Sequence, residues 1–153
     1  MRKIVVGAAL LALLASALVA GAYAASTGPE AQTRKLTFVG RATSFTHVDN
    51  PPKNVFGQGD YVVYTGAGKL GTGTGQCTQH SKTGAKPVIN YCMATFSLEG
   101  GQLIVAGAVI DEAKRNMMAV IGGTGSYRGA RGQAVESYID DESSRWALTF
   151  ETT

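Results

Sequence analysis

Apolar and polar residues alternate along several short segments of the chain, most clearly near the C-terminus. There Trp146, Leu148 and Phe150 share one side of an extended segment, and the residues between and beside them are Arg, Ala, Thr and Glu. Successive side chains of a β-strand point to opposite faces. The pattern therefore predicts a strand with one buried face and one solvated face.

Short runs of β-forming residues recur upstream, separated by Gly, Pro, Asn and Asp at intervals typical of an all-β sandwich or barrel. We predict eight strands, over residues 36–46, 60–67, 70–80, 88–98, 102–110, 116–122, 128–139 and 145–152. The connections at 99–101 and 140–144 are short and rich in turn-forming residues. Successive strands are therefore expected to be antiparallel neighbours in a meander.

Two segments depart from simple alternation. In residues 102–110, Leu103 and Val105 lie on one face and Ile104 and Ala106 on the other, so both faces are apolar. This predicts that a second subunit, or else a loop or the N-terminal leader, covers the outer face. Residues 108–121 lack Gly and Pro and carry acids before bases, which is compatible with a helix. We expect strand, loop and strand there, because the segment runs into a Gly-Gly pair.

The N-terminus has the layout of a secretory signal peptide. Arg2 and Lys3 precede an apolar run over residues 4–20, and Ala22-Tyr23-Ala24 forms a cleavage-type triplet. An uncleaved membrane anchor is the alternative, because a span needs roughly 17 residues or more. We expect cleavage near Ala24 and secretion, so that the mature protein has no membrane partner. The expected organisation is a signal peptide over 1–24, a flexible leader over 25–35 and a barrel over 36–153.

The charge of the mature chain is nearly balanced. Without Arg2 and Lys3, 12 of the 14 basic residues remain against 11 acidic ones. This balance disfavours nucleic acid as a partner. The 20 Gly residues among 153 also disfavour a helical bundle, because Gly destabilises helix interiors.

The two cysteines, Cys77 and Cys92, are predicted to form a disulfide, since thiols in exported proteins are usually oxidised. A hairpin whose turn is centred on Gly84 and Ala85 pairs residues whose numbers sum to 169, as 77 and 92 do. Directly opposed residues in an antiparallel ladder have the separation that a disulfide needs. Two buried free thiols are the alternative. A metal site is not expected, because two cysteines without patterned histidines do not make a zinc site.

The glycines of residues 70–80 fall on one face. Gly71, Gly73 and Gly75 lie on the same side as Cys77, which leaves that side almost without side-chain volume. Inside an eight-stranded barrel such a strip favours a ligand cavity. The alternative is that these glycines permit the coiling of the barrel. The glycines of 122–132 lack both the Lys of a phosphate-binding loop and a βαβ context, so no nucleotide cofactor is expected.

Residues 119–132 read AVIGGTGSYRGARG, and with the blocks at 69–71, 94–98 and 101–107 the chain resembles the allene oxide cyclase and dirigent barrel families. The resemblance implies an all-β fold, an eight-stranded antiparallel up-and-down barrel, often a homodimer or homotrimer. It also implies a cavity for a small hydrophobic or phenolic molecule and no metal or organic cofactor. The activities it implies are cyclisation or isomerisation of the bound molecule, or stereoselective coupling of phenolic intermediates.

The resemblance to dirigent proteins implies a catalytic arginine, which is Arg128 or Arg131 in this sequence. Their numbers differ in parity, so at most one faces the interior. An inward arginine needs an acidic partner or a substrate anion. It would hold a carboxylate or enolate.

Further catalytic candidates lie near the predicted barrel mouth. Residues 36–46 contain no acidic residue, unlike the first strand of the plant cyclases, and Asp49 follows them. Asp60, Tyr61 and Tyr64 are candidates for proton exchange with a ligand, with rim tyrosines that only pack as the alternative. Tyr61 is also a candidate ligand-binding residue, together with the glycines of residues 70–80. No serine, histidine and acid grouping supports a hydrolase.

The sequence therefore predicts a secreted barrel that binds a small hydrophobic molecule and directs its cyclisation, isomerisation or coupling. Shape alone lowers the entropic part of such a barrier, so few catalytic residues are needed. Two alternatives remain open. One is a non-catalytic carrier with the same cavity, and the other is a structural protein with a filled barrel.

Overall fold

The computed structural model describes residues 31–50, 54–80, 84 and 86–153, with the backbone alone for 47–50 and 54–56. The predicted signal peptide, residues 1–24, lies outside the described residues, and so do residues 25–30 of the predicted leader.

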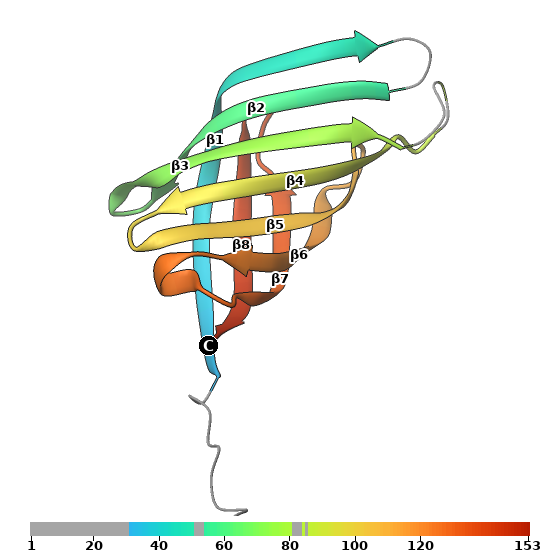
Figure 1. Ribbon diagram of the computed structural model, residues 1–153. Helices are drawn as coiled ribbons and strands as arrows, with labels where there is room; N and C mark the ends of the chain where they lie inside the picture. The colour runs from blue at the N-terminus through green and yellow to red at the C-terminus, as the bar shows by residue number, and fades with distance from the viewer. Residues whose placement is uncertain (1–30, 51–53, 81–83, 85) are drawn as a thin grey trace, which may run out of the picture. The chain divides into compact units, whose positions relative to one another are not determined.

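Eight antiparallel strands form a closed barrel, in which each strand pairs with the next and β8 pairs with β1 (Figure 1). The strands are β1 (Gln32–Asn50), β2 (Asn54–Thr65), β3 (Gly68–Gln79), β4 (Ile89–Leu98), β5 (Gly101–Ile110), β6 (Arg115–Gly123), β7 (Arg131–Tyr138) and β8 (Ser143–Thr152). Each predicted strand overlaps one of these. The prediction of an eight-stranded up-and-down barrel is confirmed.

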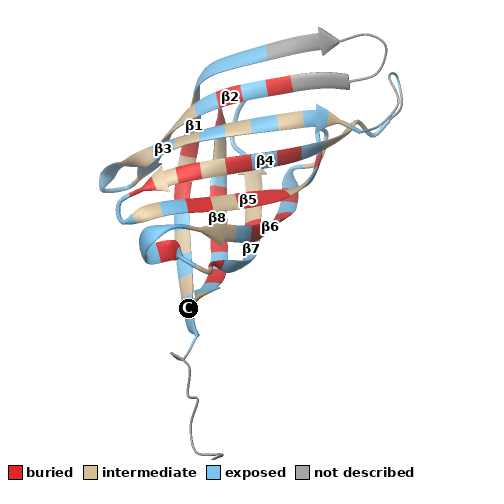
Figure 2. Cartoon of the chain, viewed as in Figure 1, coloured by how far each residue is buried: buried red, intermediate tan, exposed pale blue. Residues whose placement is uncertain are grey.

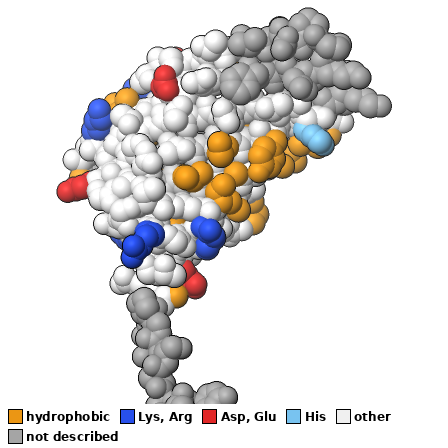
Figure 3. Space-filling model, in the orientation of Figure 1, with side chains coloured by type: hydrophobic (Ala, Val, Ile, Leu, Met, Phe, Trp, Pro, Cys, Tyr) orange, Lys and Arg blue, Asp and Glu red, His pale blue; other side chains and the backbone are white. Residues whose placement is uncertain are grey.

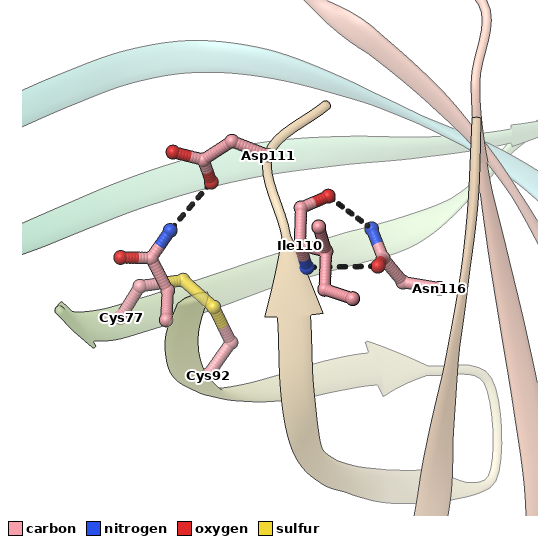
Figure 4. The surroundings of a disulfide bond; sticks show 6 residues. Cys77, Cys92, Ile110, Asp111 and Asn116 are labelled. Carbon is pink, nitrogen blue, oxygen red and sulfur yellow. Dashed lines mark hydrogen bonds between the residues drawn. A yellow bond between two sulfur atoms is a disulfide. The ribbon is translucent and has the colours of Figure 1, made fainter. Parts of the chain in front are cut away.

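The alternative of a helix within residues 108–121 is wrong. Strands β5 and β6 occupy most of that segment, and residues 111–114 connect them. Buried Asn116 holds this connection, because its side chain accepts a hydrogen bond from the Ile110 N–H at 2.9 Å and donates one to the Ile110 carbonyl at 3.4 Å (Figure 4). The helix-forming composition is thus overridden by pairing with the neighbouring strands.

The first strand begins at Gln32, so the expectation of a flexible leader is wrong for residues 32–35. These residues pair with β8, where Lys35 lies opposite Thr149. The Arg34 guanidinium donates a hydrogen bond to the Ser126 carbonyl at 2.8 Å and lies 5.0 Å from the centre of the Tyr127 ring. Backbone pairing and this arginine contact order a segment whose polar composition resembles a leader.

The glycine-rich motif of residues 122–132 lies at the end of the barrel where the β4–β5 connection lies. The seventh strand begins at Arg131 and not at 128, because a single 3-10 turn over Gly125–Tyr127 precedes it. Gly125 has a φ of +58°, and a Cβ there would lie 2.1 Å from the Gly100 carbonyl oxygen. The turn therefore packs directly on the β4–β5 connection. Buried Tyr127 donates a hydrogen bond from its hydroxyl to the Glu99 carbonyl at 3.3 Å.

The core fills the half of the barrel next to this motif. Its largest fully buried side chains are Phe38, Val63, Phe96, Leu103, Val105, Val120, Leu148 and Phe150. Figure 2 shows buried residues recurring along the strands. The rings of Phe38 and Phe96 meet edge to face with centroids 4.8 Å apart, and those of Phe96 and Trp146 lie 5.0 Å apart. These contacts contribute about 0.5–1.5 kcal/mol each beyond area burial.

The outer face of β4, β5 and β6 carries exposed hydrophobic side chains (Figure 3). They are Tyr91, Met93, Ile110, Met117 and Ile121. The predicted apolar character of both faces of residues 102–110 is therefore present, whereas the subunit expected to cover the outer face stays a prediction. Among the described residues, no helix is long and apolar enough to cross a membrane.

Candidate functional site

The other half of the barrel is hollow and contains a cavity of about 390 Å³. The change from filled to hollow occurs within single strands. In β4, Leu98 belongs to the packed core and Cys92 to the cavity wall, whereas in the antiparallel β5 Leu103 is core and Val109 is wall. The cavity therefore lies toward the end of the barrel formed by the β5–β6 and β7–β8 connections. Its volume suits a small organic molecule.

One part of the cavity wall is apolar. Ala94, Phe96, Val109, Met118 and Trp146 contribute to it, and Phe96 and Trp146 also belong to the aromatic core. The wall is therefore anchored by the packed half of the barrel, which makes the cavity largely preformed. A preformed apolar wall lowers the cost of ordering on binding.

The predicted disulfide between Cys77 and Cys92 is present and is also part of the wall (Figure 4). The two residues are register partners on β3 and β4, with their Cα atoms 4.1 Å apart. The predicted pairing sum of 169 holds along this hairpin, from Gly71 opposite Leu98 to Gln79 opposite Asn90. The cross-link fixes the two strands where the cavity begins.

One carboxyl group and two phenols belong to the polar part of the wall. Burial raises the pKa of the Glu136 carboxyl above its usual range, although a hydrogen bond from the Ser144 side chain partly opposes this. Burial, followed by the charges of Glu136 and Asp60, raises the pKa of the Tyr61 hydroxyl. Burial, with Glu136 as the next cause, raises the pKa of Tyr138 to about 12. Both tyrosines are therefore hydrogen-bond donors at neutral pH, beside a carboxyl group able to exchange a proton.

Further carboxylates surround the mouth. Asp111, labelled in Figure 4, accepts a hydrogen bond from the Asn90 side-chain amide. Both residues line the cavity. Asp140, Asp141 and Glu142, from the β7–β8 turn, line it as well. Hydrogen bonds to the Asp140 carboxylate, first from the Glu142 backbone N–H at 3.0 Å, lower the pKa of Asp140.

The predicted ligand-binding residues are only partly brought together. Tyr61 and Gly75 line the cavity as expected. Gly71 and Gly73 do not, which corrects the expectation that the whole glycine strip lines a hollow. A Cβ at Gly73 would lie 3.0 Å from the Phe96 ring, and one at Gly71 would lie 2.1 Å from the Ser97 carbonyl oxygen. At those positions the glycines admit close packing of β3 against β4.

The expectation of an arginine facing the cavity is also corrected. Arg128 and Arg131 are both exposed, and neither lines the cavity. On β7 it is Ala134 that is buried and Glu136 that reaches the cavity, so the opposite parity of Arg131 directs it outward. Arg131 instead donates a hydrogen bond to the Ala130 carbonyl at 2.7 Å.

Asp60 and Tyr64 likewise lie away from the cavity, which corrects their placement at its mouth. The inward positions of β2 include Tyr61 and Val63, so Asp60 falls on the outer face, where it accepts a hydrogen bond from the Ser44 hydroxyl at 2.9 Å. Tyr64 is exposed beyond a register shift that follows Val63. The backbone of Asp49 belongs to β1, but its side chain lies outside the described residues.

Sequence reasoning missed Glu136 and Tyr138. Both have the parity of Ala134 in the stretch Ala-Val-Glu-Ser-Tyr, so an acid at a predicted inward position was the available signal. Asn90 and Asp111 gave no comparable signal, because they flank turns. The described residues contain no group of three or more His, Cys, Asp and Glu side chains placed to hold a metal ion.

The closed eight-stranded antiparallel barrel, packed at one end and enclosing a cavity at the other, defines the fold class. Comparison of the sequence with family models gives the family. The allene oxide cyclase barrel like domain matches residues 55–145, and the chain belongs to that family. Comparison with curated proteins gives no significant match.

Solved structures of the same fold include proteins with varied titles. A pyocyanin demethylase matches with a TM-score of 0.67 and 16% identity, over 76% of this chain and 99% of that one. A pterocarpan synthase dirigent protein matches with a TM-score of 0.68 and 19% identity, over 86% and 98%. A Diels-Alderase from Streptomyces koyangensis matches with a TM-score of 0.62 and 16% identity, over 99% and 84%. At these identities the similarity shows the fold.

Proposed function

We propose that this chain is a secreted barrel protein that binds a small hydrophobic molecule in its cavity and directs its cyclisation or isomerisation. The observation that carries the proposal is the carboxyl group of Glu136. It lines a cavity whose wall is partly apolar, its pKa is raised by burial, and Tyr61 and Tyr138 lie in the same wall. Carboxyl groups with raised pKa values are characteristic of sites of proton transfer.

The chemistry follows from these three groups. A carboxylate at Glu136 accepts a proton from one atom of the bound molecule and returns it to another, so that atoms and charge balance over the cycle. Tyr61 or Tyr138 donates a hydrogen bond to the oxygen on which negative charge develops. The apolar wall meanwhile holds the molecule in a folded shape, which lowers the entropic part of the barrier.

The comparisons support this class of function. The solved relatives named above include a Diels-Alderase and a dirigent protein, both with this fold. Because a dirigent protein has the same fold, we also include stereoselective coupling of phenolic molecules among the proposed reactions. A structural protein with a filled barrel is disfavoured by the cavity of about 390 Å³. A non-catalytic carrier remains the second candidate, favoured by the exposed positions of Arg128 and Arg131.

The proposal is tested by capture and turnover. Mature protein purified from its native source is examined by mass spectrometry for bound organic molecules, and each molecule found is incubated with fresh protein. We expect a change in its connectivity or stereochemistry that is lost in Glu136→Gln and retained in Glu151→Gln. Glu151 is a matched control because it is exposed. Binding with no turnover would favour the carrier, and no binding would overturn the proposal.

Secretion is part of the proposal and is supported by the signal-like N-terminus and by the disulfide, which suits an oxidising compartment. N-terminal sequencing of protein from the culture medium should begin near Ala25. Protein that remains in the cell with Met1 or an intact apolar segment would contradict it.

A further inference from the structure

Where the structure describes the chain, the charged side chains that line the cavity all have the same sign. Five carboxyl groups line it, from Asp111, Glu136, Asp140, Asp141 and Glu142. Among the described residues, no Lys, Arg or His belongs to the wall. The negative charge of this wall is opposite to the charge that an inward arginine would supply. The cavity is the same site as in the proposed function.

Two basic residues in this part of the structure, Arg41 and Lys86, do not line the cavity. Arg41 is close enough to influence Asp140, but it is exposed and does not line the cavity. Lys86 forms its ion pair with Glu112 at 2.8 Å, and both side chains are solvated. Within the described part of the chain, a ligand in the cavity therefore faces carboxyl groups with no basic side chain in the wall, and low-dielectric walls strengthen the resulting negative potential.

The aromatic part of the wall acts in the same direction. Phe96 and Trp146 line the cavity with rings 5.0 Å apart, and Tyr61 contributes a third ring. The faces of such rings attract cations, most strongly when the cation has left water. Carboxylates and aromatic rings together form the kind of wall that recognises an organic cation, and they also accept an uncharged apolar molecule.

We propose that the cavity selects cationic and uncharged apolar molecules and rejects anionic ones, free fatty acids included. The selection is set at two depths. Asp111 and the acids of the β7–β8 turn repel an anion as it enters, and Glu136 repels it once it is inside. This inference rests on the proposed function, since it specifies the molecules that the same cavity takes.

The test uses three probes that share one ring system and differ in charge. They are 2-naphthylmethanol, 2-naphthylmethylammonium and 2-naphthoate, titrated into the disulfide-intact mature protein by calorimetry at neutral pH and low salt. We expect the ammonium and the alcohol to bind and the carboxylate to bind at least about tenfold more weakly than the alcohol. Because the mouth acids are solvated, the penalty should shrink as salt rises toward physiological strength.

Variants separate the two depths. Glu136→Gln should reduce the preference for the ammonium over the alcohol, measured as the ratio of their two dissociation constants. The triple variant Asp140→Asn, Asp141→Asn, Glu142→Gln should reduce the salt dependence of naphthoate binding. Glu151→Gln, which removes an exposed acid outside the cavity, should change neither. Circular dichroism confirms that each variant is folded.

The outcomes distinguish this inference from the proposed function. If naphthoate binds as tightly as the ammonium, the charge selection is wrong and the cavity remains a binding site. If none of the three probes binds, the proposed function itself is contradicted.

Discussion

Tyr61 and Glu136 interact across the interior of the barrel although their strands, β2 and β7, are not neighbours in the sheet. Both side chains line the cavity, and the carboxyl of Glu136 is, after burial, the next cause of the raised pKa of Tyr61. The closed barrel is what brings them together, because neither residue is a register partner of the other. A site of this kind exists only in the folded chain.

Glu136→Gln should reduce turnover of a captured substrate by at least about a hundredfold, because a positioned proton carrier typically contributes that much or more. The amide is close in size to the carboxyl and cannot exchange the proton. We would measure kcat and the ligand dissociation constant, and we expect the loss in kcat. Glu151→Gln serves as the control. Equal kcat values for wild type and Glu136→Gln would exclude Glu136 as the proton carrier.

The same substitution predicts a change in the pH dependence of stability. The pKa of Glu136 is raised in the folded state, so between its unfolded and folded pKa values the folded protein binds more protons. Its contribution to stability therefore falls as pH rises through that window and stays low above it. Thermal unfolding across pH 4–8 should show that Glu136→Gln is more stable than wild type at the upper end and similar at the lower end. The reverse order at neutral pH would contradict a raised pKa for this carboxyl in the folded state.

Removing the disulfide should destabilise the barrel. Cys77 and Cys92 close a loop with a sequence separation of 15, for which the chain-entropy model gives about 3 kcal/mol. Urea unfolding of Cys77→Ala/Cys92→Ala, compared with oxidised wild type, measures the difference. Titration of denatured, non-reduced protein should find no free thiol. Two free thiols in secreted protein would show that the bridge does not form.

Substitution of the motif arginines should leave function nearly unchanged. Arg128 and Arg131 are exposed, and surface substitutions usually change stability by less than about 0.5 kcal/mol. Arg128→Ala and Arg131→Ala are therefore expected to alter turnover and ligand affinity by less than about twofold. A loss of turnover comparable to that of Glu136→Gln would instead support the catalytic arginine that the family resemblance implies.

The homodimer or homotrimer stays a prediction, and the outer face of β4, β5 and β6 is where we expect the contact. Met117 on this face is 64% exposed. Sedimentation of wild type should show an oligomer that Met117→Asp dissociates, since a buried carboxylate in an apolar interface is costly. Thr149→Asp, on the exposed face of β8, is the control. A wild-type monomer at all concentrations would rule out this interface.

Much of the fold was predictable because hairpin pairing is local. One assumed turn position fixed the register of β3 and β4, and with it the opposition of Cys77 and Cys92. The start of β7 was missed because residues 125–130 form a turn around two glycines with positive φ, Gly125 and Gly129, within sequence that otherwise resembles a strand. Turns stabilised by distant segments leave little local signal.

The site was less predictable for a different reason. Alternation shows which residues share a face, and it grouped Gly71, Gly73 and Gly75 on one side of their strand. It does not show where the interior is filled, because that depends on how side chains from eight strands meet. Gly73 is inward and covered by Phe96, whereas Gly75 borders the cavity. Glu136 and Tyr61 come together only through closure of the barrel.

The most direct test of ligand binding in the cavity is to fill the cavity by replacing a glycine of its wall with a larger residue. Gly75 lines the cavity, and a Cβ added there would lie 3.2 Å from the Tyr61 ring. The larger side chain of Gly75→Leu would therefore occupy cavity space. Thr74→Leu adds similar bulk on the exposed face of the same strand. Fluorescence titration with N-phenyl-1-naphthylamine, an uncharged probe, should show binding to wild type and Thr74→Leu and at least about tenfold weaker binding to a folded Gly75→Leu. Equal affinity in all three proteins would show that small apolar molecules do not bind in this cavity.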